Sequence, residues 1–154
     1  MGTYFPLFVD IANRKILVVG AGTIATRRAE VLADFDADVL VVAPDGTERM
    51  KELEQARRVT WQHRPFAESD LNGIWMAVTA TDDMELNSRV AAVCRQRKIP
   101  VNHAGDKNQS DFYFPGIARE GNVVVGVTAS GTNHRLARKV TEAAKAWLRQ
   151  YPGT

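Results

Sequence analysis

A glycine-rich turn between a short apolar run and an amphipathic segment constrains the fold of this chain most. The run Lys15–Gly20 reads KILVVG, which is typical of a buried parallel strand that ends at a glycine. The next residues continue as far as Ala25 with the pattern G-x-G-x-x-A and open a segment with helical apolar spacing. A strand, this turn and a helix in this order predict a nucleotide-binding β-α-β unit over residues 15–43.

The residue types of the turn follow from the chemistry of an anion site. Gly20 permits the tight turn, Gly22 lets the backbone approach a pyrophosphate, and Ala25 lets the helix lie close to the strand. Free N–H groups and the helix dipole then favour the anion. We predict cofactor contacts from Gly20, Gly22, Thr23, Ile24 and Ala25. The alternative is a plain strand-to-helix turn without a ligand.

The alternation of strand and helix patterns continues along the chain. Further strands are predicted at Asp38–Ala43, Val59–His63, Trp75–Thr79 and Ile99–Asn102, and helices from Ala25 to Ala33, at Asp45–Arg57 and at Met84–Arg97. Strands and helices that alternate at this spacing predict an α/β fold with a Rossmann-type parallel sheet. Among the strands, Val59–His63 alternates like an exposed edge strand.

The pattern changes in the last third of the chain. Residues 117–128 predict a β-hairpin, and Asn133 to about Leu148 predicts a helix. The apolar stripe of this helix consists of Leu136, Val140, Ala143, Ala144 and Trp147. We therefore predict a Rossmann domain at 1–111 and a small α+β dimerisation or substrate-side element at 112–154. Packing of this element on its own Rossmann sheet is the alternative.

Composition and charge exclude several classes of function. The net charge is only +2 and the basic residues are dispersed, which argues against a nucleic-acid partner but leaves anionic small molecules. No apolar run reaches the roughly 18 residues of a membrane span, and the amino terminus does not resemble a signal peptide. The single cysteine, Cys94, forms neither an internal disulfide nor a cysteine-based metal cluster. We expect a cytoplasmic protein without a metal site.

The ends of two further strands add cofactor candidates. The second strand ends at Ala43, Pro44 and Asp45. An acid at this place commonly binds the adenosine ribose, and Asp45 stands slightly late for that role. Since no arginine there attracts a 2′-phosphate, we predict NAD as the cofactor. The fourth strand ends in small residues that suit a bound cofactor, namely Thr79, Ala80 and Thr81.

Several segments together support a family resemblance. In chain order they are Tyr4–Phe8, VVGAGTIATRRAE at 18–30, AVTATDD at 77–83 with Asn87, Val101-Asn102, Asp111–Pro115, Val124–Thr128 and Ser130–Thr132 before Leu136–Arg138. Over nearly all of its length the chain resembles precorrin-2 dehydrogenase, the amino-terminal module of siroheme synthase. Some relatives also act as sirohydrochlorin ferrochelatase. No single motif is decisive, but their order and spacing are specific.

The resemblance implies a function and a site. The family uses NAD to oxidise precorrin-2 to sirohydrochlorin, with a Rossmann domain followed by a dimerisation element, so a homodimer is expected. The tetrapyrrole would lie against the nicotinamide near the ends of the fourth and fifth strands, where Asn102 joins the cofactor contacts. Its carboxylates need cations and amide donors. The candidates for these contacts are Ser130, Gly131, Thr132 and Arg138. The alternative for Arg138 is a solvated helix face.

The chain departs from the family at the key acid. The family usually reads Asn-Val-x-Asp, whereas Asn102 is followed here by His103, Ala104 and Gly105, so that the family's aspartate falls on Gly105. Three explanations compete. Asp106 takes the role, which we favour, or His103 acts as the base. In the third, the chain is a non-catalytic NAD- or tetrapyrrole-binding module, a sensor or carrier. An ordinary loop histidine is the alternative for His103.

Two further expectations concern metal insertion and a third class of function. Larger relatives carry another helical region after the point where this sequence stops, so we expect metal insertion to be weak or absent. A ligand-gating domain of a transport regulator shares the Rossmann fold and is a third class of function. The segments Asp111–Pro115 and Thr128–Arg138 argue against that class.

Overall fold

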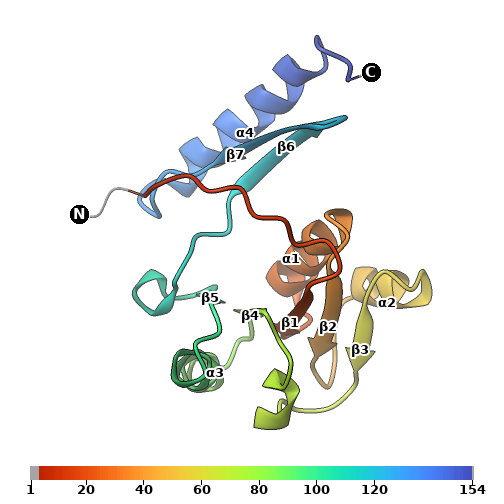
Figure 1. Ribbon diagram of the computed structural model, residues 1–154, viewed down its shortest axis with the longest axis vertical. Helices are drawn as coiled ribbons and strands as arrows, with labels where there is room; N and C mark the ends of the chain where they lie inside the picture. Colours follow the sequence, from red (N-terminus) through yellow and green to blue (C-terminus); the bar gives the residue numbers. More distant parts are fainter. Residues whose placement is uncertain (1–3, 154) are drawn as a thin grey trace. The chain divides into compact units, whose positions relative to one another are not determined.

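A five-stranded parallel sheet organises the larger of two units in the computed structural model, which describes residues 4–153 (Figure 1). This unit is Val9–Phe112. Its strands are β1 (Lys15–Val19), β2 (Asp38–Val42), β3 (Thr60–Gln62), β4 (Met76–Thr79) and β5 (Val101–His103). They lie in the order β3-β2-β1-β4-β5, so the direction of winding reverses between β1 and β4. The predicted Rossmann-type sheet is confirmed.

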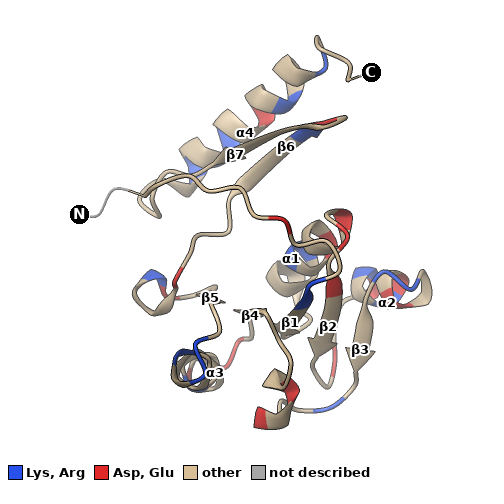
Figure 2. Cartoon of the chain, viewed as in Figure 1, with Lys and Arg blue, Asp and Glu red and all other residues tan. Residues whose placement is uncertain are grey.

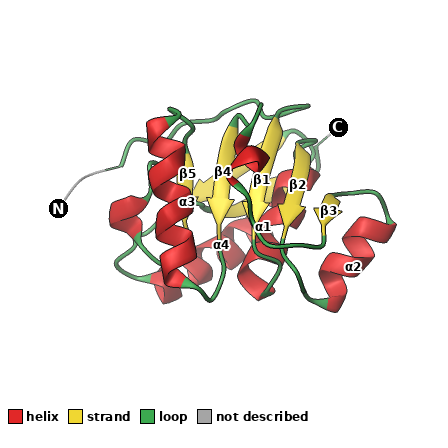
Figure 3. Ribbon diagram, turned by 90° about the horizontal axis from the view of Figure 1, so that it is seen from below, coloured by secondary structure: helices red, strands yellow, loops and turns green. Residues whose placement is uncertain are grey.

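Helices cover both faces of this sheet. They are α1 (Thr23–Asp34), α2 (Glu48–Gln55) and α3 (Met84–Gln96), with short 3-10 turns η1 (Glu68–Leu71) and η2 (Lys107–Gln109). Figure 3 shows α3 on one face and α1 on the other. Since the strands are covered on both sides, they are almost uniformly apolar; Ile16, Leu17 and Val18 of β1 are fully buried.

Two α-helices of this unit begin at side-chain caps. The Thr47 hydroxyl accepts a hydrogen bond from Met50 N at 3.1 Å, and the Asp83 carboxylate accepts one from Leu86 N at 3.0 Å. The helix predicted from Asp45 therefore begins later, at Glu48. The reason is tertiary, because Thr47 N is already bonded to Ala21 O at 3.0 Å.

Strand β5 ends later than predicted and takes His103 into the sheet. The segment that follows turns back and bonds to its outer edge. Ser110 Oγ accepts from His103 N at 2.8 Å, and Asp111 Oδ2 accepts from Val101 N at 2.9 Å. His103 is therefore a buried strand residue, 2% exposed, and its interpretation as an ordinary loop histidine is wrong.

The second unit consists of residues 113–153 together with residues 4–8. Antiparallel strands β6 (Gly116–Glu120) and β7 (Val123–Val127) form a hairpin on which α4 (His134–Leu148) packs. Gly116 allows the close approach, because a Cβ there would overlap the Thr141 hydroxyl. The predicted α+β element is confirmed. None of the helices within residues 4–153 is long and apolar enough to cross a membrane.

The large side chains of the predicted apolar stripe of α4 are not buried in this unit. Thr141 and Leu148 are the buried residues of the helix and lie against the hairpin. Leu136, Val140 and Trp147 are 50%, 45% and 52% exposed. Helical spacing places these three on one adjacent stripe, so an apolar surface of α4 is left uncovered within this unit.

Candidate functional site

The phosphate turn follows β1 and packs against the carboxyl end of β4. Gly20 has a φ of +113°, a backbone conformation that favours glycine. A Cβ at this position would overlap the Ala80 carbonyl oxygen and lie 3.2 Å from Thr81 Cγ2. Gly20 N also donates to Val42 O at 3.0 Å. Glycine is therefore required at position 20, because the carboxyl ends of β1, β2 and β4 lie too close together there for a side chain.

Gly22 is the N-cap of α1 and differs from Gly20 in its surroundings. Its backbone is extended, and a Cβ there would meet nothing within 4 Å. The first turn of α1 carries no acidic residue, and no side chain in the described part of the chain caps it. The first N–H groups of the helix, from Thr23 onwards, are consequently exposed at an open surface. This arrangement suits a phosphate group.

The other residues of the turn behave as the motif requires. Ala25 is fully buried, so α1 lies close to the sheet, whereas Ile24 is 52% exposed beside the open surface. The Thr26 hydroxyl bonds the Thr47 hydroxyl at 2.8 Å and the Ala21 carbonyl at 3.3 Å. The turn is thereby fastened to the loop between β2 and α2.

This β2–α2 loop carries the next group of predicted contacts. Ala43 is buried and its carbonyl accepts from Trp61 Nε1 at 2.9 Å, while Pro44 and Asp45 are exposed. A Cβ on Gly46 would lie 2.6 Å from Ala21 Cβ and 2.7 Å from Trp61 Cη2. The loop therefore packs against the phosphate turn through Gly46, and the exposed Asp45 is the residue before it.

Charge at this loop disfavours an additional phosphate. Arg49 pairs with Glu30 and with Glu52, the latter at 2.7 Å. These hydrogen bonds raise the pKa of Arg49 and lower the pKa of Glu30. Because the guanidinium is already paired and Asp45 is anionic, the loop favours a ribose hydroxyl over a 2′-phosphate.

Asn87 organises the end of β4. Its side-chain oxygen accepts from the Thr79 hydroxyl at 2.7 Å and from the Thr81 hydroxyl at 2.7 Å. Its amide nitrogen donates to Thr81 O at 2.9 Å and approaches Met84 Sδ at 3.8 Å. Thr79 is fully buried, so its hydroxyl serves this network, and Ala80 and Thr81 form the surface against Gly20.

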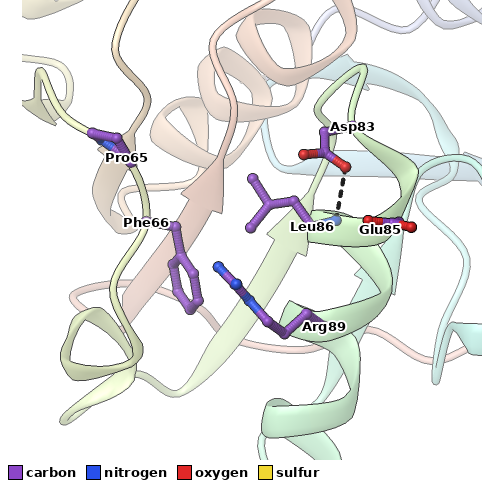
Figure 4. Close-up of a pocket in the computed structure, with 6 residues that line it drawn as sticks. All are labelled: Pro65, Phe66, Asp83, Glu85, Leu86 and Arg89. Carbon is purple, nitrogen blue, oxygen red and sulfur yellow. Dashed lines mark hydrogen bonds between the residues drawn. The ribbon is translucent and has the colours of Figure 1, made fainter.

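A cavity of about 360 Å³ lies beside the start of α3, in the unit Val9–Phe112 (Figure 4). It is lined by Pro65, Phe66, Asp83, Glu85, Leu86 and Arg89. Figure 4 shows the Arg89 guanidinium extended toward the Phe66 ring, with Leu86 above them. The cavity adjoins the phosphate turn, because Thr81 lies next to Gly20 and its hydroxyl accepts from Asp83 N at 3.2 Å. A planar ring between apolar walls and a cation fits this space.

The two candidate catalytic residues have different environments. Asp106 caps η2, accepting from Gln109 Nε2 at 2.9 Å and Asn108 N at 2.8 Å. These hydrogen bonds lower the pKa of the Asp106 carboxyl, so it is a weaker base than an ordinary aspartate. His103 Nδ1 accepts from Gly105 N at 3.1 Å, and its Nε2 has no hydrogen-bond partner within residues 4–153.

Gly105, where the family's aspartate falls, lies beside the Met84 side chain. A Cβ there would lie 2.8 Å from Met84 Cε and 3.6 Å from His103 Cε1. Met84 thus occupies space that a larger residue at 105 would need. In the described part of the chain no group of three or more His, Cys, Asp or Glu side chains could hold a metal ion.

Asn102 makes structural hydrogen bonds at both ends of its amide. It accepts from Arg28 and donates to Phe112 O at 2.8 Å. Burial, and then the charge of Arg27, lower the pKa of Arg28 to about 10. Asn102 therefore links α1, β5 and the returning segment, which positions the edge of the site.

The predicted substrate contacts lie in the second unit, at the β7–α4 loop. Ser130 and Gly131 have φ values of +55° and +71°, and the Thr132 hydroxyl bonds Ala129 O at 2.7 Å. Arg138 is exposed on α4, whose first turn carries no acidic residue. Figure 2 shows Lys and Arg along this helix. The loop and helix start form a cationic surface suited to carboxylates.

Sequence reasoning missed some residues of this site as contributors. It included Asn87 in the resemblance without a role, and did not select Arg28, Met84, Phe66 or Arg89. The one usable signal was Asn87, a polar residue at a helical position that the neighbouring apolar residues would bury. The cavity walls come from segments distant in sequence and had no local signal.

Known proteins match this chain over most of its length. Residues 7–116 match a family described as putative NAD(P)-binding. The chain is 35% identical over 150 residues to a siroheme synthase of Mannheimia succiniciproducens, covering 97% of this chain and 32% of that protein. It is 34% identical over 139 residues to a probable multifunctional siroheme biosynthesis protein of Ruminiclostridium josui, covering 90% of this chain and 27% of that one. The chain thus spans about a third of the length of these relatives.

A solved structure is similar as well. It is described as SirC, precorrin-2 dehydrogenase, and superimposes with a TM-score of 0.80 at 25% sequence identity. The match covers 93% of this chain and 70% of that one, so it includes elements of both units.

Proposed function

Since this chain belongs to the family of putative NAD(P)-binding proteins, we propose that it uses NAD to oxidise precorrin-2 to sirohydrochlorin in siroheme synthesis. The predicted resemblance to the siroheme synthase amino-terminal module is confirmed. The observation that carries the proposal is the uncapped start of α1 at Gly22, open at the point where the sheet reverses. The structure described as a precorrin-2 dehydrogenase supports the reaction.

In the proposed arrangement each half of NAD meets one half of the sheet. The N–H groups after Gly22 hold the pyrophosphate. Asp45 receives the adenosine ribose, and the cavity between Phe66 and Arg89 receives the adenine ring. The nicotinamide half lies over the ends of β4 and β5. Bound NAD supplies the hydride acceptor.

The chain's own residues would then hold the substrate and take a proton. We assign the tetrapyrrole carboxylates to Ser130, Gly131, Thr132 and Arg138. Loss of a hydride leaves a proton to be removed, for which Asp106 and His103 are the candidates. Val9–Phe112 would be the NAD-binding domain, and the second unit the dimerisation and substrate-side element.

An anaerobic assay with precorrin-2 and NAD, following NADH absorbance, tests this function. We expect turnover by the wild type and at least a tenfold loss in Asp106→Ala, as general base catalysis contributes roughly 100-fold or more. Asp106→Asn is the matched variant, because the asparagine oxygen can still accept from Asn108 N, while only the bond from Gln109 Nε2 to the other carboxylate oxygen is lost. Full activity in Asp106→Asn would remove this carboxylate from the mechanism.

A specific observation favours a second candidate function. Gly105 lacks the carboxyl that the family places there, and Asp106 is engaged in capping η2. A non-catalytic NAD- or tetrapyrrole-binding module would have this arrangement. The same assay separates the two functions: measurable NAD binding without NADH formation would overturn the dehydrogenase and support the binding module.

We also propose a homodimer formed through the uncovered stripe of α4. Val140→Glu should convert a wild-type dimer to monomer, because it places a charge among half-exposed apolar side chains. Ala146→Glu, an exposed position outside the stripe, is the control. Sedimentation velocity reads the outcome, and a wild type that stays monomeric at high concentration would contradict the proposal.

A cytoplasmic location is also part of the proposal, since Cys94 is an unpaired buried thiol.

A further inference from the structure

His103 carries a buried hydrogen-bonding atom that the fold itself does not use. The residue is 2% exposed, and its Nε2 has no partner in the part of the chain that the structure describes. Leaving a buried donor or acceptor unsatisfied destabilises the folded state. Such atoms are rare, and each calls for a physical explanation.

The backbone determines which form of the imidazole is present. Gly105 N–H donates to Nδ1 at 3.1 Å, so Nδ1 is the acceptor and carries no proton. In the neutral ring the proton is then on Nε2. The unused atom is therefore a donor, and its natural partner is an oxygen acceptor.

The position of His103 indicates where that acceptor lies. In the sheet register His103 pairs with Thr79, the last residue of β4. Gly20 of the phosphate turn contacts Ala80, one residue further along. The imidazole thus stands at the carboxyl ends of β4 and β5, on the half of the sheet opposite β2 and its adenosine loop.

We propose that His103 Nε2–H donates a hydrogen bond to an oxygen of the nicotinamide riboside half of NAD. The assignment rests on the proposed function, since it requires NAD in this site. It makes His103 a cofactor-binding residue. It also removes His103 as the base, because Nδ1 is engaged by Gly105 and Nε2 carries the proton.

Met84 explains how a buried imidazole reaches a ligand. Its thioether lies over Gly105, where a Cβ would be 2.8 Å from Met84 Cε and 3.6 Å from His103 Cε1. Met84 is 49% exposed, and methionine has three flexible side-chain torsions. Because Met84 lies beside this edge of the ring, a change of its rotamer would give a ligand access to the imidazole without movement of the backbone.

Calorimetric titration with two ligands tests the proposal on the full chain. NAD contains the nicotinamide riboside, and ADP lacks it while keeping the adenosine and pyrophosphate. His103→Leu should weaken NAD about tenfold and change ADP affinity by less than about twofold. His103→Gln should keep NAD within about threefold, because its amide N–H reaches a position near that of Nε2. His63→Leu, at an exposed histidine that pairs with Glu54, is the matched control.

Stability of the ligand-free protein supplies a second readout. His103→Leu removes the unsatisfied donor and also the acceptor of Gly105 N–H, which belongs to an exposed residue that water can reach, so the thermal midpoint should be no lower than that of the wild type. If the ratio of NAD affinity to ADP affinity is the same in His103→Leu as in the wild type, the inference is overturned. The proposed function, which requires only that NAD binds, would still stand. A wild type that binds neither ligand would overturn the proposed cofactor and this assignment with it.

Discussion

Replacing Gly22 by valine should abolish NAD binding while the protein remains folded. The backbone at Gly22 is extended and a Cβ would meet nothing within 4 Å, so the fold has room for the side chain. That same open space is where the pyrophosphate would approach the first N–H groups of α1. We expect NAD affinity to fall at least about 100-fold and the free energy of unfolding to change by less than about 1 kcal/mol.

Calorimetry with NAD and urea unfolding measure these two quantities on the same preparation. Gly126→Val is the matched control. Gly126 lies in the second unit, away from the phosphate turn in sequence, and a Cβ there meets only Pro115 Cβ at 3.9 Å. It should leave NAD affinity unchanged. Wild-type affinity in Gly22→Val would mean that the pyrophosphate does not lie on this turn.

Gly20→Ala should have the opposite profile, with a large loss of stability. Its φ of +113° is strained for alanine, and the added Cβ would overlap the backbone carbonyl of Ala80. The Ala80 carbonyl can move away from the added Cβ only if the ends of β1 and β4 separate. We expect the free energy of unfolding to fall by at least about 3 kcal/mol, the sum of a conformational and an overpacking cost.

Gly73→Ala separates the two costs. Gly73 also has a positive φ, +73°, but a Cβ there meets nothing within 4 Å. Gly73→Ala should lower the free energy of unfolding by only about 1–2 kcal/mol, which is the conformational cost alone. Urea unfolding followed by tryptophan fluorescence compares both variants. Equal losses would mean that the Ala80 contact relaxes and does not constrain Gly20.

Features that depend on neighbouring residues were predictable from the sequence. Strand β1 is a continuous apolar run because both of its faces are covered, and the run ends at Gly20, where the backbone requires glycine. The start of α1 could be placed because the turn motif and the helix are contiguous. The hairpin and α4 followed from similar local patterns, although the part of the α4 stripe that remains uncovered did not.

Features that depend on distant residues were not predictable. The later start of α2 depends on Ala21, and the burial of His103 depends on Ser110 and Asp111, which return to the edge of β5. Asp106, which the sequence favours as the base, is a different case, because its partners Asn108 and Gln109 are only two and three residues away and aspartate commonly forms such turns.

The sequence by itself determined that this chain forms a Rossmann-type unit with a phosphate turn at Gly20–Ala25, because backbone conformation and side-chain size act locally there. Only the tertiary structure decided which polar atoms remain available to a ligand. Hydrogen-bond partners come from any part of the chain, so the unused donor of His103 appears only after Ser110 and Asp111 have returned to the edge of β5.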